Sequence, residues 1–408
     1  MNTQAVAEFR RSPFRFLVSV SGGGAAFVSD YLAIPGASAS LIEALVPYSK
    51  AATDDFLGKA PESYCSERTA RLLAAAAFAR AVRLEPDSDP NLLLGVGATA
   101  SLVSNQPKKG DHRVYCAVVS RRGTFSATLA LTKDARTRGG EERLAADFIL
   151  SLLLFVARKT AADDAEEPWR EYSDKLPLVT DVPSLPDDDA SVAWTRLDHD
   201  SADFLYGTRN GEAPAVKALR FVGGRLDAAE PCELARRPVF PGSFNPPHRG
   251  HLAIAKLGAE KAGRQTIFEL SARNVDKPPL DPLELVRRVD AMNDANPGAV
   301  VCVSNAPRFV EKAAVMPDST FLVGTDTILR LGDPKYEDDS VEKRDAVIER
   351  LARFGARFIV FPRKVAGKLL APDELADAIP EALRNLCQFV SPDEFLDDVS
   401  STELRKRR

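Results

Sequence analysis

Histidine, cysteine and long apolar runs are all scarce in this sequence of 408 residues. The five cysteines are widely scattered and include no Cys-x-x-Cys pair, so the spacing of a disulfide framework is absent. Reduced thiols are typical of a cytosol-like compartment, and we expect a cytoplasmic protein. The formal net charge is only −4, which gives no general attraction to a phosphate backbone, so we expect no nucleic-acid partner.

The longest apolar run, from Phe148 to Ala157, is far shorter than the roughly 20 residues that a membrane span needs. It predicts a buried helix, and we expect no membrane partner. The arginines near the N-terminus are not followed by an apolar segment with a small-residue cleavage site, so the sequence predicts no secretory signal. Targeting to an organelle is left open.

The length predicts two domains, and the composition shows where they divide. Strand-like and helix-like segments alternate from Phe14 to about Lys159 and again from Arg237 onward, which is typical of α/β layers. Between them, Asp163 to Asp189 holds ten acidic and two basic residues and is broken by prolines, as linkers are. We expect domains at 1–160 and 236–408, joined over 161–235 by an acidic linker that ends in a small β segment or an extended connection.

Two of the four histidines, His248 and His251, lie three residues apart in the stretch PVFPGSFNPPHRGHLAIAKL. The stretch predicts a short strand, a tight turn at Gly242, a small Ser243 that lets backbone amides approach a ligand, and a helix that begins after two prolines. Residues three apart share a helix face, so both imidazoles would project from the first turn, at the positive end of the helix dipole. The pattern therefore predicts an anion site.

Three interpretations of this histidine pair compete. It could be a chance helix start with exposed histidines, a zinc site completed by distant ligands, or a site for a nucleoside triphosphate. The helix lacks the glutamate of a His-Glu-x-x-His zinc motif, which counts against the second interpretation. The coincidence of strand, glycine turn, prolines and paired histidines favours the third.

The segment GSFNPPHRGH resembles the GxFxPxHxGH signature of nucleotidylyltransferases, which transfer AMP or CMP from a triphosphate. The resemblance covers about residues 237–408 and implies a Rossmann-like domain with a parallel sheet. It also implies that His248 and His251 are catalytic and that ATP is bound by Gly242, Ser243 and Phe244.

A second segment near the C-terminus, VSSTELRKR, resembles the ISSTxIR motif of the same family. The resemblance implies that Ser401 and Thr402 cap a short helix and grip the triphosphate together with Arg405. Without the histidine motif, the segment would read as an ordinary helix cap with a surface arginine.

Two further segments resemble acceptor-side elements of this family. In FLVGTDTILRL, Gly324 and Asp326 match a Gly-x-Asp that contacts the nucleotide ribose or the acceptor, although Asp326 could equally be a helix cap. In SARNVDKPPLDP, Asn274 and Lys277 match the acceptor-binding loop, and Lys277 could equally be a solvated loop lysine.

The SSTxxR ending and the Asn-x-x-Lys-Pro loop look most like those of nicotinamide or nicotinate mononucleotide adenylyltransferases of NAD biosynthesis. This resemblance implies that ATP, brought with Mg²⁺, and the mononucleotide give the dinucleotide and pyrophosphate. The acceptor phosphate is already an anion, so the reaction needs alignment and charge neutralisation rather than a general base. The alternatives are transfer to another phosphate acceptor, or a nucleotide-binding regulator with little turnover.

The N-terminal segment 19–58 resembles the C-terminal domain of the competence-associated CinA proteins, which include nicotinamide mononucleotide deamidases. The resemblance places a candidate site at Ser19, Ser21, Tyr48 and Ser49.

This N-terminal resemblance departs from the family at the chemical positions. Val18 replaces a glutamate and Thr53 replaces a lysine, the family's candidate for taking the proton of the serine. We therefore expect a degenerate domain with little deamidase activity, which would serve in homo-oligomerisation or nucleotide sensing.

Overall fold

The computed structural model describes residues 1–105, 109–161, 168–180, 182, 184–185, 187–206, 217–222, 225–228, 231–272, 280–365 and 368–395. The chain forms two compact units. The first unit comprises Met1–Pro214 together with Asp281–Glu284, and the second comprises Ala215–Leu280 and Leu285–Arg408. Among the described residues, no helix combines the length and apolar character required to cross a membrane.

The first unit contains a seven-stranded mixed sheet in the order β2-β1-β3-β4-β5-β7-β6. β1 is parallel to β2 and β3, and the remaining neighbours are antiparallel. The strands are β1 (Arg15–Ser21), β2 (Leu41–Leu45), β3 (Leu93–Ser101), β4 (His112–Ser120), β5 (Gly123–Leu131), β6 (Tyr172–Lys175) and β7 (Asp189–Arg196).

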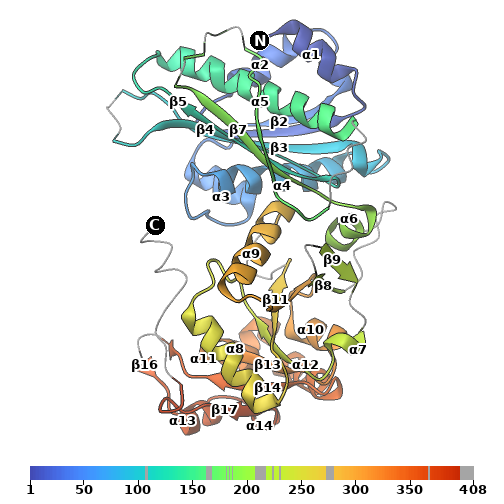
Figure 1. Cartoon of the computed structure of the whole chain (residues 1–408), viewed down its shortest axis with the longest axis vertical. Helices are drawn as coiled ribbons and strands as arrows, with labels where there is room; N and C mark the ends of the chain where they lie inside the picture. The colour runs from blue at the N-terminus through green and yellow to red at the C-terminus, as the bar shows by residue number, and fades with distance from the viewer. Residues whose placement is uncertain are drawn as a thin grey trace. The chain divides into compact units, whose positions relative to one another are not determined.

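Helices cover both faces of this sheet, with α1, α2 and α5 on one face and α3 and α4 on the other (Figure 1). The apolar run that the sequence predicts to be a buried helix lies within α5, and its residues are buried in the core. The helices of the unit are α1 (Thr3–Arg10), α2 (Ala26–Leu32), η1 (Ala37–Ala39), α3 (Lys50–Leu57), α4 (Glu67–Leu84), η2 (Pro90–Leu92), α5 (Arg138–Ala161) and α6 (His199–Tyr206).

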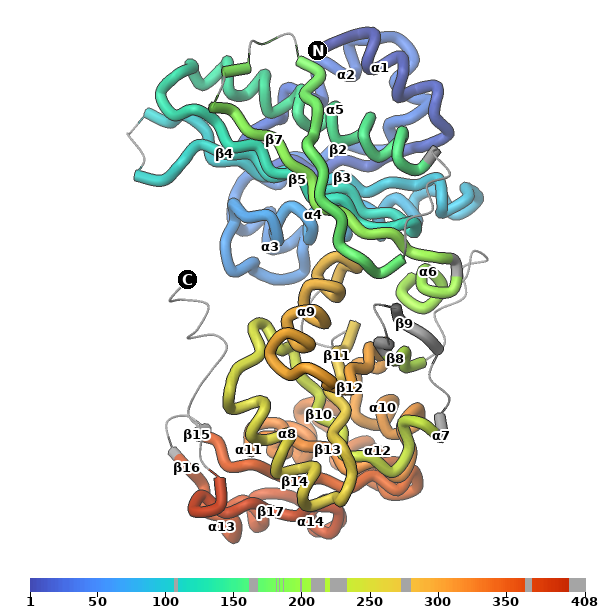
Figure 2. The backbone as a smooth tube through the Cα atoms, in the orientation of Figure 1, coloured from blue at the N-terminus to red at the C-terminus, as the bar shows by residue number. Residues whose placement is uncertain are grey.

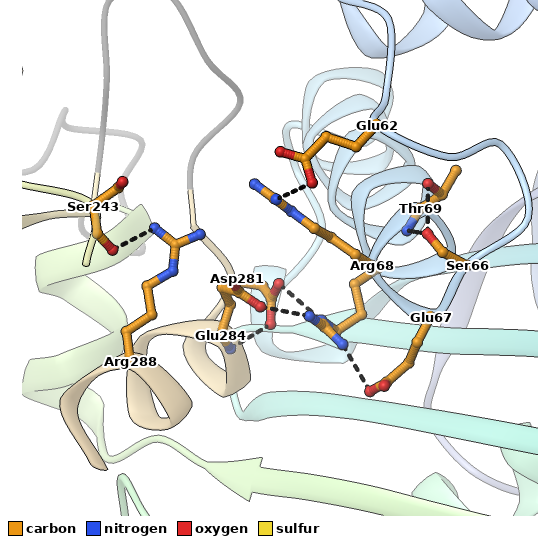
Figure 3. Close-up of polar contacts among 10 residues, drawn as sticks. Glu62, Ser66, Glu67, Arg68, Thr69, Ser243, Asp281, Glu284 and Arg288 are labelled. Atoms are coloured by element: carbon orange, nitrogen blue, oxygen red, sulfur yellow. Dashed lines mark hydrogen bonds and ion pairs between the residues drawn. The ribbon is translucent and has the colours of Figure 1, made fainter. Parts of the chain in front are cut away.

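Helix α4 packs unusually closely on β3, because two glycines of that strand lie beneath it. A Cβ atom at Gly95 would lie 2.1 Å from the carbonyl oxygen of Ala74, and one at Gly97 would lie 2.3 Å from that of Ala70. The helix begins where Ser66 Oγ accepts the backbone N–H of Thr69 (Figure 3). The two glycines therefore serve helix packing, rather than forming a ligand-binding loop.

The segment expected to be a linker contains strands of both units, which differs from the expectation. β7 pairs with β5 along eight residues, and Trp194 of β7 stacks on Phe125 at 5.5 Å between ring centroids. The acidic composition is compatible with this burial because Asp188, just before β7, forms an ion pair with Arg136 in which both side chains are nearly inaccessible. The units divide at residue 214 instead of at 160 and 235.

The second unit contains an eight-stranded sheet in the order β17-β14-β13-β10-β11-β12-β8-β9. Six strands are parallel, as expected for a Rossmann-like domain, whereas β8 and β9 are antiparallel additions at one edge. The strands are β8 (Ala218–Val222), β9 (Arg225–Ala228), β10 (Pro238–Pro241), β11 (Ile267–Ser271), β12 (Val300–Ser304), β13 (Thr320–Gly324), β14 (Arg357–Phe361) and β17 (Cys387–Phe389); a separate ribbon pairs β15 (Lys364–Val365) with β16 (Lys368–Leu369).

The chain winds outward from β10 in both directions, first through β11 and β12 and then through β13 and β14 (Figure 2). Ligands of such sheets bind beyond the carboxyl ends of the strands where the winding reverses, which here is the end of β10. The helices are α7 (Pro231–Leu234), α8 (Arg249–Ala262), α9 (Pro282–Ala295), α10 (Phe309–Val315), α11 (Thr325–Gly332), η3 (Pro334–Glu337), α12 (Val341–Arg353), α13 (Pro372–Asp377) and α14 (Glu381–Arg384). The expected α/β class is confirmed for both units.

Candidate functional site

The loop between β10 and α8 lies at the winding reversal and carries four candidate residues, Gly242, Ser243, Phe244 and His248. Its first peptide is fixed because the N–H of Gly242 donates to the carbonyl oxygen of Glu269 in β11, at 3.0 Å. A side chain at Gly242 would collide with the ring of Phe244, since a Cβ atom would lie 2.6 Å from Cζ of that ring. Phe244 has a φ of 41°, and its buried ring fixes the loop to the core.

The two histidines come together as the sequence predicts. His248 is the N-cap of α8, and its backbone N–H donates to Nδ1 of His251 at 3.2 Å. The imidazoles stack with 3.6 Å between ring centroids, and the ring of Phe244 meets His251 edge-on at 5.1 Å. The first turn of α8 therefore presents two parallel imidazoles at the positive end of the helix.

The protonation state of His251 follows from this arrangement. Burial, together with the nearby His248 and the positive charge of Arg363, lowers the pKa of His251 to about 3. The ring is therefore neutral at pH 7. Because Nδ1 accepts a hydrogen bond, the remaining proton lies on Nε2, and His251 acts as a neutral hydrogen-bond donor through that atom.

Gly324 and Asp326 lie at the start of α11, beyond the carboxyl end of β13, which neighbours β10. Gly324 is the N-cap, and a Cβ atom there would lie 2.8 Å from Oδ1 of Asp326. Oδ1 of Asp326 has no hydrogen-bond partner among the described residues and lies 3.8 Å from Nη1 of Arg363. Oδ1 itself is buried, whereas the side chain as a whole is 35% exposed, so the carboxylate is accessible through its other oxygen.

Two arginines that the sequence did not single out lie beside this loop and α11. Arg363 follows β14, and its backbone N–H donates to Oγ1 of Thr325 at 3.2 Å, which holds it beside α11. Arg288 of α9 donates from Nη1 to the carbonyl oxygen of Ser243 at 3.2 Å (Figure 3). Both arginines have a pattern in the sequence that could have indicated them. Arg363 follows a strand-like segment. Arg288 lies three residues from Leu285 and four from Met292, on the apolar face of its helix.

Several predicted residues lie outside the described part of the chain. These are Asn274 and Lys277 of the acceptor segment, and Ser401, Thr402 and Arg405 of the C-terminal motif. The described chain extends to Phe395. Phe395 packs against Phe361 at the end of β14 with 5.3 Å between ring centroids, and Glu394 pairs with Lys261 of α8 at 2.6 Å.

The first unit brings together some of its candidate residues but not others. Oγ of Ser21 and Oγ1 of Thr53 both donate to the carbonyl oxygen of Pro47, at 3.2 and 2.8 Å. Ser49 is the N-cap of α3, where its Oγ accepts from the N–H of Ala52, and Tyr48 is 68% exposed. Ser19 is fully buried in β1, and its Oγ has no partner among the described residues.

The glycine turn after β1 is filled by protein atoms. A Cβ atom at Gly22 would lie 2.4 Å from the carbonyl oxygen of Ala100, and one at Gly23 would lie 2.5 Å from Cδ1 of Leu102. Arg138 also donates to the carbonyl oxygen of Gly22 at 2.8 Å. The glycines are therefore required for close packing of the chain on itself.

Within the described ranges, no group of three or more histidine, cysteine, aspartate or glutamate side chains is arranged to hold a metal ion.

Comparison with known proteins identifies the relatives of the C-terminal part. Residues 239–407 match the cytidylyltransferase-like family. The probable nicotinate-nucleotide adenylyltransferase of Salinibacter ruber (strain DSM 13855 / M31) is 26% identical over 185 residues, which cover 42% of this chain and 84% of that protein. Its counterpart from Gloeobacter violaceus is 26% identical over 186 residues, covering 42% and 83%. The predicted resemblance to nucleotidylyltransferases is confirmed at this level.

The chain is also similar to solved structures of CinA proteins, the group that its N-terminal sequence resembles. A CinA superfamily protein of Klebsiella pneumoniae 700603 covers 39% of this chain and 99% of its own, with 14% identity and a TM-score of 0.32. The competence damage-inducible protein A of Klebsiella pneumoniae subsp. pneumoniae covers 40% and 98%, with 17% identity and a TM-score of 0.30.

Proposed function

We propose that the second unit, a nucleotidyltransferase domain, transfers AMP from ATP to the phosphate of nicotinate or nicotinamide mononucleotide and releases pyrophosphate. The observation that carries the proposal is the stacked pair His248–His251 in the first turn of α8, at the winding reversal of the sheet. The names of the two curated relatives favour nicotinate mononucleotide as the acceptor. The product would be a dinucleotide of NAD biosynthesis.

The chemistry is one in-line displacement. An oxygen of the acceptor phosphate forms a bond to the α-phosphorus of ATP, and the bond from that phosphorus to the bridging oxygen breaks. Pyrophosphate leaves with the electron pair. The attacking oxygen carries no proton at neutral pH, so the site needs alignment and charge neutralisation instead of a general base.

The described residues supply that neutralisation from three neighbouring strands. His251 donates from Nε2 after β10, the first turn of α8 adds its dipole, and the exposed guanidinium of Arg363 after β14 adds a full positive charge. Asp326 after β13 would accept from a hydroxyl of the ribose or the acceptor. Mg²⁺ would enter as part of the ATP complex and would offset part of the charge on its phosphates.

The C-terminal motif would complete the triphosphate site. Phe395 is fixed on Phe361 at the binding edge of the sheet. Ser401, Thr402 and Arg405 follow within ten residues along the chain and would bind the triphosphate. Asn274 and Lys277 would hold the acceptor.

The test is an assay of the full-length chain with MgATP and a panel of phosphate acceptors, in which pyrophosphate release is measured. We expect the fastest release with nicotinate mononucleotide, less with nicotinamide mononucleotide, and the dinucleotide as the second product. Absence of pyrophosphate with both mononucleotides would refute the proposal.

A second candidate is cytidylyl transfer, and the match to the cytidylyltransferase-like family favours it. The same assay with MgCTP in place of MgATP, and with phosphate monoesters such as glycerol phosphate as acceptors, distinguishes the two. Release of pyrophosphate from CTP but not from ATP would establish this candidate.

A further inference from the structure

We infer that Arg288 is a positioning residue that holds the loop Gly242–Phe244 in the conformation that binds ATP. This inference rests on the proposed function, because it concerns the same loop. Arg288 does not touch the reacting atoms. It acts through the backbone of Ser243.

The first observation is the place of Arg288 on its helix. Helix α9 buries Leu285, Val289 and Met292, and Arg288 lies on the same face with only 6% of its surface exposed. A guanidinium in such a place is costly unless its N–H groups find acceptors. One of them donates to the carbonyl oxygen of Ser243 at 3.2 Å, so the loop supplies an acceptor to this buried guanidinium (Figure 3).

The second observation is the conformation of the loop at that point. Phe244 has a φ of 41°, a region that residues other than glycine rarely adopt and that persists only when the surroundings enforce it. Two restraints act on either side of Ser243, namely the bond from Gly242 N–H to Glu269 and the buried ring of Phe244. The bond from Arg288 fixes the peptide that lies between them.

The direction of this bond matters for an anionic ligand. In a planar trans peptide the C=O and the following N–H point in opposite directions. Because the carbonyl of Ser243 faces Arg288, the N–H of Phe244 is turned away from α9. Without the guanidinium, this peptide could rotate and present its carbonyl oxygen to the triphosphate instead.

The test compares three variants of the full-length chain. Arg288→Met removes the donors but keeps an apolar stem, and Arg288→Lys keeps one charged donor without the planar fork. Arg353→Met is the matched control, since the side chain of Arg353 is 78% exposed on α12 and pairs only with Glu349 at 3.6 Å in the described contacts of that helix. The dissociation constant of MgATP is measured by calorimetry, and kcat, both KM values and Tm are measured alongside.

We expect Arg288→Met to weaken MgATP binding and raise the KM for ATP about 10-fold, because ATP must then order the loop itself. The KM for the mononucleotide at saturating ATP should stay within about twofold. Arg288→Lys should fall between wild type and Arg288→Met, and Arg353→Met should match wild type.

The inference fails if Arg288→Met is folded and binds MgATP as wild type does while wild type turns over, a result that leaves the proposed function intact. It also fails if both KM values rise equally and in step with a fall in Tm, because that pattern indicates general destabilisation. A wild-type chain that neither binds MgATP nor releases pyrophosphate overturns the proposed function and this inference together.

Discussion

His251 is the side chain whose surroundings most strongly define a chemical role. Its Nδ1 is committed to the N–H of His248, and Nε2 carries the donor proton at neutral pH. His251→Ala removes a contact that strengthens as charge builds on the α-phosphate, so we expect kcat to fall by about 10² or more. Steady-state pyrophosphate release measures this.

The matched control is His199→Ala, the same change in α6 of the first unit. It should leave turnover unchanged. A His251→Ala variant that keeps near-normal kcat would show that the imidazole has no part in the transition state.

The lowered pKa of His251 also makes stability depend on pH. Unfolded histidine titrates near 6.5, whereas the folded side chain titrates at about 3, so between these values the unfolded chain binds the proton more tightly. The contribution of neutral His251 to the free energy of unfolding is fully present above pH 6.5. It is lost as the pH falls toward 3, by up to about 1.4 kcal/mol per pH unit.

Urea unfolding followed by far-UV circular dichroism between pH 4 and 8 measures this slope for the second unit. Both tryptophans of the chain, Trp169 and Trp194, belong to the first unit, so tryptophan fluorescence reports the unfolding of that unit. A transition that is seen by circular dichroism but not by fluorescence is therefore the unfolding of the second unit. His251→Gln should flatten the slope below pH 6.5. An unchanged slope in that variant would mean that other groups cause it.

At the scale of elements, the contact of α4 with β3 depends on the absence of two side chains. In Gly97→Ala the new Cβ would lie 2.3 Å from the carbonyl oxygen of Ala70 and 2.4 Å from the N of Ala74. Both are helix backbone atoms, so α4 must move as a whole. We expect a loss of about 1–3 kcal/mol in the free energy of unfolding of the first unit.

Tryptophan fluorescence during urea unfolding reports this transition. Gly110→Ala is the control, because a Cβ atom at Gly110 would have no described atom within 4 Å. Equal stability of the two variants would show that α4 can shift on the sheet at little cost.

The ends of β11 and β12 are joined to α10 by a buried ion pair. Nζ of Lys312 donates to Oε1 of Glu269 at 2.8 Å, to Oγ of Ser271 at 2.5 Å and to the carbonyl oxygen of Ala306 at 2.8 Å. Lys312→Met would leave the carboxylate of Glu269 buried without its cation, and we expect it to cost the second unit about 3–5 kcal/mol.

A double-mutant cycle separates the interaction between Lys312 and Glu269 from the contacts that each side chain makes with other groups. Adding Glu269→Gln to Lys312→Met should recover part of the loss, because the buried charge is then removed. If the two losses simply add in urea unfolding, the two side chains do not stabilise each other.

The sequence predicted elements whose local signals agree and missed those that depend on distant partners. The turn at Gly242 and the helix start at His248 each have a local cause, and both are where they were expected. β7 was missed because its acidic surroundings resemble a linker. The burial of Asp188 is tolerable because Arg136 and Thr132, both far away in the sequence, donate to its carboxylate. Arg288 and Arg363 belong to no motif, so their roles required the fold.

At the scale of the whole molecule, the chain joins a unit that matches the cytidylyltransferase-like family over residues 239–407 to a unit whose serines are poorly placed for hydrolysis. Ser19 is buried, the hydroxyl of Ser21 donates to the carbonyl oxygen of Pro47, and the hydroxyl of Thr53, where the sequence resemblance predicts a lysine, donates to the same oxygen. We expect the full-length chain to release ammonia from nicotinamide mononucleotide at no more than about 10⁻³ of its rate of adenylyl transfer, since a nucleophile without a base loses several orders of magnitude.

A coupled ammonia assay measures this, with Ser21→Ala as the comparison. Ammonia release that matches adenylyl transfer and disappears in Ser21→Ala would establish a second active site. The first unit should be isolated as residues 1–206, because a fragment of 1–160 lacks β7 and exposes the edge of β5 that β7 covers.

The stacked imidazoles also provide a built-in spectroscopic reporter. With only four histidines in the chain, their ring-proton resonances are few enough to assign by single substitutions. We expect those of His251 to be displaced by the ring currents of His248 and Phe244, whose ring centroids lie 3.6 and 5.1 Å from that of His251. They should stay fixed as the buffer is titrated between pH 5 and 8 and move when nucleotide arrives, so that occupancy can be read from one unlabelled signal.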